Sequence, residues 1–193
     1  ESQRSAWELF KGKAKCIECH SFSGSSPFFT DFKFYNTGIV ATDQNFENLS
    51  RRAEETRLRK DRERLDPSSL AHKPEFSELG RFLVTNELKD IGAFKTPTLR
   101  DVELTGPYMH NGSLKTLLDV VRFYNQGGTK NPHLDHKMRP LNLNEKEMSE
   151  LVEFLRALTS NEILRLAQTS KPQTRLPVPV PHVGAAKKRA LGH

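Results

Sequence analysis

The chain has 193 residues, of which 35% are hydrophobic and 28% are charged, and its formal net charge is +6. This length indicates one domain with room for a tail. No apolar run approaches the roughly 18 residues of a membrane-spanning helix, so we expect no transmembrane segment. The basic residues are interspersed with acidic ones, which argues against nucleic-acid binding and favours solubility or the steering of an acidic partner.

The first predicted element is an amphipathic helix that ends in a cysteine motif. Apolar residues recur at helical spacing between residues 7 and 14, and the only two cysteines follow at Cys16 and Cys19, with His20 directly after them. C-x-x-C-H is the attachment signature of a c-type haem, in which the thiols form thioethers and the histidine ligates the iron. A zinc site would need more Cys or His ligands, and a thioredoxin-like motif would need a βαβ context. We therefore expect one covalently bound haem c.

The middle of the chain is predicted to be loop-rich, with one charged helix. Residues 23–45 are expected to form a loop, and residues 46–66 carry Glu and Arg at i, i+4 spacing. This spacing predicts an exposed helix that ends at Pro67, with a docking surface as the alternative interpretation. Residues 76–112 are punctuated by Gly and Pro and predict short segments.

A helix is predicted from about Ser113 to Gln126, with Ser113 as N-cap and Gly127 as its C-terminal stop. Its inward face would hold residues at i, i+3, i+4 and i+7, namely Leu117, Val120, Val121 and Tyr124. Beyond this helix, His133 and His136 lie three residues apart beside Asp135. A metal site there is an open alternative to a solvated loop.

A second helix is predicted from about Glu145 to Thr159. Asn144 and Glu147 have the spacing of a capping box. The buried stripe would be Leu151, Phe154, Leu155 and Leu158, and Met148 is expected to pack. After residue 170 the repeated prolines predict an extended arm that either frays or lies across a partner.

Five motifs follow one another along the chain: CIECH, FYNTG, GRFLVT, GAFKTPTLRDVELTGPYMHNGSLKTLLDVVRFYNQGG and PLNLNEKEMSELVEFLRALT. In this order, over about residues 5–160, they resemble the C-terminal haem domain of the bacterial dihaem cytochrome c peroxidase and MauG family. The resemblance implies a mainly α, class I cytochrome c-like haem domain with long loops, an inserted charged helix and an extended Pro-rich C-terminal arm. The haem domain would span residues 1–165, with an insertion at about 23–90, and the basic tail would span 166–193.

The resemblance also implies the iron ligands. His20 would be the proximal ligand, and Tyr124 the distal one, because the family places this ligand on the helix after its P-Y-x-H-x-G motif. A packing role for Tyr124, with its hydroxyl bonded to backbone, stays open. Met109 and Met138 are the alternative thioether donors.

Other positions inherit expected roles from the same motifs. Arg100 would lie near the haem propionates, and Lys95 and His110 near the haem edge. The backbone carbonyls of Thr105 and Pro107 would bind a calcium ion at the interface with a second haem domain, which would supply the remaining ligand.

Family members usually carry a peroxide-reactive haem in an N-terminal domain and an electron-relaying haem in a C-terminal one. This chain has one C-x-x-C-H and resembles the second half only. We therefore expect no catalytic residue in it and an electron-transfer role in a peroxidase-type oxidoreductase. The peroxide-reactive haem would lie in a partner chain or a missing N-terminal domain. A stand-alone monohaem carrier, or a structural haem subunit of a respiratory complex, is the alternative.

The expected partners are this second haem-bearing chain or domain and a small redox protein that donates or accepts electrons. Haem attachment to C-x-x-C-H takes place outside the bacterial cytoplasm. The expected location is therefore periplasmic or otherwise extracytoplasmic, with a leader peptide already removed.

Overall fold

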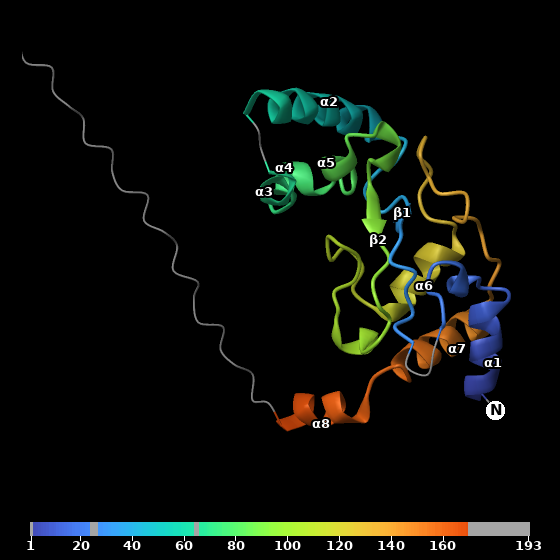
Figure 1. Ribbon diagram of the computed structural model, residues 1–193. Helices are drawn as coiled ribbons and strands as arrows, with labels where there is room; N and C mark the ends of the chain where they lie inside the picture. The colour runs from blue at the N-terminus through green and yellow to red at the C-terminus, as the bar shows by residue number, and fades with distance from the viewer. Residues whose placement is uncertain (1, 24–26, 64–65, 170–193) are drawn as a thin grey trace, which may run out of the picture.

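The computed structural model describes residues 2–23, 27–63 and 66–169, and it is mainly helical (Figure 1). Its helices are α1 (Ser2–Lys11), α2 (Phe46–Glu63), α3 (Pro67–Ala71), α4 (Pro74–Ser77), α5 (Phe82–Thr85), α6 (Leu117–Asn125), α7 (Glu145–Arg156) and α8 (Asn161–Thr169). Three short 3-10 helices are η1 (Cys16–Glu18), η2 (Leu88–Asp90) and η3 (Val102–Leu104). Strands β1 (Phe34–Asn36) and β2 (Ala93–Lys95) pair antiparallel, with Tyr35 opposite Phe94. The expected mainly α fold is confirmed.

The first hydrophobic core joins α1, α6 and α7 around the cysteine turn (Figure 1). Phe10 on α1 is buried and its ring contacts Phe29 and Phe154, with centroids 6.1 and 5.1 Å away. Lys13, just after α1, hydrogen-bonds the carboxylate of Glu147 on α7 at 2.7 Å. Helix α1 is thereby fixed on α7, so the turn that follows α1 has a defined position.

Capping boxes define the starts of α6 and α7. Asn144 and Glu147 form the predicted box, and α7 ends at Arg156, three residues before the predicted end. The prediction that α6 begins at Ser113 is wrong, because Thr116 is the N-cap and Asp119 completes its box. The preceding residues are held in an antiparallel bridge between Tyr108 and Leu114, so they are unavailable to the helix.

A second hydrophobic core is built from α2 to α5 and lies away from α1 and α7 (Figure 1). The charged helix α2 was predicted to be exposed, but one of its faces is buried. Leu49, Ala53 and Thr56 recur at i, i+4 and i+7 on its buried face, each with 2% exposure or less. Charged side chains elsewhere on α2, such as those of Arg51 and Glu55, are exposed. This core therefore fixes the 41–91 segment beside the β1–β2 pair.

Helix α8 continues into the stretch assigned to the tail, and Figure 1 shows it at the edge of the molecule. The predicted Pro-rich arm from residue 170 onward lies outside the described residues. Within the described part of the chain, no helix has the length and apolar character needed to cross a membrane.

Candidate haem-attachment site

The C-x-x-C-H segment folds into a tight turn. Lys15 adopts a left-handed conformation (φ 54°), after which Cys16–Glu18 form η1. The backbone N–H of His20 donates to the Cys16 carbonyl at 2.9 Å. The two thiols and the imidazole are therefore presented from one turn of chain, as haem attachment requires.

Cys16 and Cys19 are half-buried free thiols. Burial raises the pKa of Cys16 to about 12 and that of Cys19 to about 11. Redox-active C-x-x-C thiols instead have a lowered pKa, because the thiolate is the reactive form. The surroundings of this pair therefore do not fit a thioredoxin-like role.

His20 is oriented by the backbone. Its Nδ1 lies 2.8 Å from the carbonyl oxygen of Phe29, so Nδ1–H donates to that carbonyl and Nε2 stays available. Burial lowers the pKa of His20, although the carbonyls of Phe29 and Pro97 and the carboxylate of Asp31 act in the opposite direction. A neutral imidazole with one nitrogen fixed by the backbone is the usual form of a histidine ligand.

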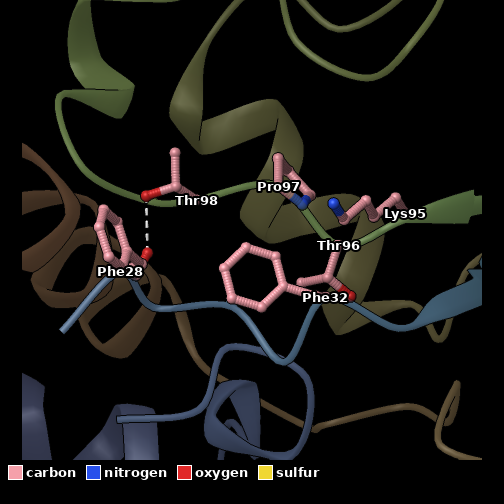
Figure 2. A pocket seen from close by; sticks show the side chains of 6 residues that line it. All are labelled: Phe28, Phe32, Lys95, Thr96, Pro97 and Thr98. Atoms are coloured by element: carbon pink, nitrogen blue, oxygen red, sulfur yellow. Dashed lines mark hydrogen bonds between the residues drawn. The ribbon is translucent and has the colours of Figure 1, made fainter. Parts of the chain in front are cut away.

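A hollow of about 540 Å³ lies between two segments of chain, and His20 contacts the carbonyl of Phe29 in one of these segments and the backbone of Pro97 in the other (Figure 2). One segment contributes Phe28 and Phe32, and the other runs from Lys95 to Thr98. The Thr98 hydroxyl joins them by donating to the Phe28 carbonyl at 2.6 Å. The two phenylalanines are 65% and 57% exposed, a large apolar surface of the kind that marks a ligand site. The two thiols and His20 have the chemistry that covalent haem attachment needs, and this apolar surface belongs to the segments that contact His20.

Tyr124 lies on α6 and is half-buried. Burial, followed by the electrostatic influence of the nearby Cys19 and Cys16, raises the pKa of its phenol. The phenol is thus within electrostatic range of both cysteines. Its hydroxyl makes no hydrogen bond within the described ranges, whereas a packing tyrosine bonded to backbone was the open alternative. The inward orientation predicted from helical spacing agrees with this placement.

The two alternative methionine donors lie in different loops. Met138 belongs to a loop that closes over the cysteine turn, because Lys137 Nζ donates to the Glu18 carbonyl at 2.9 Å and Arg139 contacts the Glu18 carboxylate at 3.1 Å. Met109 lies in the loop before α6, in a left-handed conformation (φ 65°). Of the two, Met138 therefore belongs to the loop that contacts the cysteine turn.

Arg100 and Lys95 both lie against aromatic rings of the site. Arg100 Nε donates to the Pro27 carbonyl at 2.8 Å, and its guanidinium lies 5.4 Å from the Phe29 ring. The Lys95 ammonium lies 5.0 Å from the Phe32 ring at the edge of the hollow. Arg100 therefore lies against the phenylalanine whose carbonyl holds His20, and Lys95 lies at the edge of the hollow.

The remaining predicted positions lie farther along the same segments. His110 stacks on Phe94 with centroids 3.7 Å apart and rings 11° from parallel, and burial lowers its pKa. Thr105 and Pro107 are exposed. His136 is exposed too, and the described residues contain no cluster of three or more Cys, His, Asp or Glu suited to a metal ion.

Three polar residues of the site were not predicted from the sequence. Tyr35 on β1 donates its hydroxyl to Asp31 at 2.5 Å and accepts a hydrogen bond from Lys137 Nζ at 2.8 Å. The Asp31 backbone N–H donates to the Cys19 carbonyl at 2.9 Å. The sequence offered one signal, which is that Tyr35 belongs to the FYNTG motif. Lys137 lies more than half of the chain away from Tyr35, so no local pattern connects the two.

No protein-family model matches the chain. The cytochrome-c peroxidase IdrP1 of Denitromonas iodatirespirans is 39% identical over 85% of this chain and 42% of its own length. The methylamine utilization protein MauG of Methylorubrum extorquens is 34% identical over 78% of this chain and 32% of its own length. The chain thus spans less than half the length of these curated relatives.

Solved structures agree on the fold. A MauG-like protein associated with microbial copper homeostasis superposes with a TM-score of 0.60 at 25% identity, over 89% of this chain and 51% of that chain. A variant of the dihaem peroxidase BthA from Burkholderia thailandensis superposes with a TM-score of 0.50 at 21% identity, over 83% of this chain and 42% of that one. The sequence and the fold together establish that the chain belongs to the dihaem cytochrome c peroxidase and MauG family.

Proposed function

We propose that this chain is the electron-relaying, C-terminal-type haem domain of a dihaem peroxidase or MauG-like enzyme, with His20 and Tyr124 as the axial ligands of its haem. The observation that carries the proposal is that one pair of cysteines is followed by a backbone-held imidazole and lies within electrostatic range of a phenol that makes no hydrogen bond to a described residue. A bound haem supplies one-electron ferric–ferrous chemistry.

The protein residues divide the work of holding such a group. Cys16 and Cys19 would fix it covalently, and the Phe29 carbonyl would keep His20 Nε2 directed at the iron. Tyr124 would complete the coordination, which leaves no open position for peroxide. Burial already disfavours ionisation of this phenol, so its ligation depends on the positive charge of the metal.

Peroxide reduction then belongs to a second haem, in another chain or in a further domain. The proposal is supported by the single C-x-x-C-H and by the coverage of less than half of the curated relatives. A calcium ion held partly by the backbone carbonyls of Thr105 and Pro107 would join the two haem domains. The net charge of +6 suits an acidic small redox protein as the electron partner, in an extracytoplasmic compartment.

The proposal is tested by steady-state turnover of the isolated, haem-loaded chain with hydrogen peroxide and a reduced cytochrome. We expect rates no higher than those of a Cys16→Ser/Cys19→Ser chain, which has no attachment site and defines the background. Robust turnover by the homogeneous haem-loaded chain would mean that this haem itself reacts with peroxide, and the relay assignment would be wrong.

A further inference from the structure

A tyrosine and a carboxylate are fixed against the cysteine turn as a hydrogen-bonded pair. The Tyr35 hydroxyl donates to Asp31 at 2.5 Å, and the Asp31 backbone N–H donates to the Cys19 carbonyl at 2.9 Å. Lys137 Nζ donates to the Tyr35 oxygen at 2.8 Å and to the Glu18 carbonyl at 2.9 Å. Both ends of the pair are therefore anchored to backbone of the segment that carries the two thiols.

The protonation states of the pair are well defined. Burial, followed by the hydrogen bond to Asp31, raises the pKa of Tyr35 to about 12. Burial opposes ionisation of Asp31, but hydrogen bonds from the Tyr35 hydroxyl and the Lys33 backbone N–H outweigh it and hold the pKa of Asp31 below its ordinary value. Near neutral pH the pair is therefore a neutral phenol whose proton already points at a carboxylate.

The other two tyrosines lack this arrangement. The Tyr108 hydroxyl contacts only the backbone carbonyl of Glu103, at 3.4 Å, and the Tyr124 hydroxyl makes no hydrogen bond to a described residue. A phenol that loses an electron becomes a strong acid, and its oxidation is easier when a base at hydrogen-bond distance takes the proton in the same step. Tyr35 is therefore the tyrosine best placed for one-electron oxidation.

We propose that Tyr35 is a redox-active tyrosine that relays single electrons at the haem edge, with Asp31 as its proton acceptor. In the forward step the O–H bond of Tyr35 breaks. The electron goes to a one-electron oxidant, here the peroxide-oxidised second haem of the proposed enzyme, and the proton goes to an Asp31 carboxylate oxygen. The products are a neutral tyrosyl radical and a protonated Asp31. An electron from the donor protein and return of the same proton restore the starting pair.

Lys137 affects how strongly oxidising the Tyr35 radical is. Its ammonium lies 4.3 Å from the centroid of the Tyr35 ring, so its positive charge disfavours removal of an electron from that ring. The radical is therefore strongly oxidising and short-lived, which suits transfer rather than storage. The inference rests on the proposed function, because the peroxide-oxidised haem that takes the electron is the second haem of that enzyme.

The test uses the haem-loaded chain and photogenerated tris(bipyridine)ruthenium(III) as the one-electron oxidant, with rapid freezing and electron paramagnetic resonance as the readout. We expect a tyrosyl radical signal that is lost in Tyr35→Phe and retained in the matched control Tyr108→Phe. Asp31→Asn keeps the phenol but removes the base, and it should slow radical formation on the order of 10²-fold, the low end of the effect of a positioned base. The haem absorption spectrum of the control Tyr108→Phe should be the same as that of the unmodified chain.

Two results would overturn the inference: an undiminished radical signal in Tyr35→Phe, or radical formation in Asp31→Asn as fast as in the unmodified chain. The ruthenium complex replaces the peroxide-oxidised haem as the oxidant. Either result would therefore say nothing about whether this chain is the electron-relaying domain, which the peroxide turnover assay tests. Conversely, peroxide turnover by the isolated chain would leave the radical measurement valid as it stands.

Discussion

Replacing Tyr124 with Phe removes one oxygen from α6. This substitution distinguishes a Tyr124 that ligates the haem iron from a Tyr124 that only packs. Its hydroxyl makes no hydrogen bond to the described part of the chain, so the substitution breaks none. A lost intramolecular hydrogen bond typically costs about 1 kcal/mol. We therefore expect the free energy of unfolding of the haem-free protein to change by less than about 0.5 kcal/mol, as for a substitution that breaks no contact.

The haem-loaded protein should respond quite differently. A phenolate is an anionic donor that stabilises ferric over ferrous iron, so its removal should raise the reduction potential on the order of 100 mV, within the roughly 0.8 V that axial ligands span. Loss of one ligand should also shift the ferric spectrum toward high spin. Tyr108→Phe, at a tyrosine with a weak 3.4 Å contact, is the matched control and should change neither property.

The measurements are ferric absorption spectra and potentiometric titration of wild type, Tyr124→Phe and Tyr108→Phe. An unchanged spectrum and potential in Tyr124→Phe would refute the ligand assignment and make Tyr124 a packing residue. In that case the same measurements on Met138→Ala and Met109→Ala decide between the two thioether donors. Only loss of the methionine that ligates the iron should shift the ferric spectrum toward high spin.

Three further predictions concern the fold that holds the site, and urea unfolding measures each of them. Thr116→Ala removes the N-cap of α6 and should cost about 1 kcal/mol, whereas Ser113→Ala, at the cap predicted from sequence, should have no effect. Leu49→Ala on the buried face of α2 should cost about 2–5 kcal/mol, and Leu58→Ala, on the same helix but 48% exposed, less than about 0.5 kcal/mol. The Lys13 ammonium donates a hydrogen bond to the Glu147 carboxylate, and so does the backbone N–H of Asn144, the N-cap of α7. These bonds, the first more than the second, hold the pKa of Glu147 below its ordinary value of 4.5. Its stabilising contribution is therefore present above pH 4.5 and lost as the pH falls through the lowered value, so Glu147→Gln should destabilise the protein at pH 7 but not at strongly acidic pH.

Local patterns predicted the elements whose causes are local. The capping box of Asn144 and Glu147 predicted the start of α7, and the helical spacing predicted the buried positions Leu117 and Val121 of α6. The cysteine turn is likewise a five-residue signal. In each case the contacts that define the structure join residues within about two helical turns of one another.

The predictions that failed depended on contacts between distant segments. The start of α6 is displaced because Leu114 pairs with Tyr108 instead of joining the helix. The charged composition of α2 concealed Leu49 and Ala53, which belong to a hydrophobic core shared with residues 70–91. The Tyr35–Asp31 pair is completed by Lys137, and no local pattern connects residues more than one hundred positions apart.

The central claim is that one haem is held covalently by Cys16 and Cys19, and the haem content of the purified chain tests it most directly. Intact-mass measurement after acid–acetone extraction should find one haem per chain, with the pyridine haemochrome absorbance at the same stoichiometry. The Cys16→Ser/Cys19→Ser chain should have the mass of the polypeptide alone after the same extraction. A wild-type chain that loses its colour and its added mass on extraction would contradict the account.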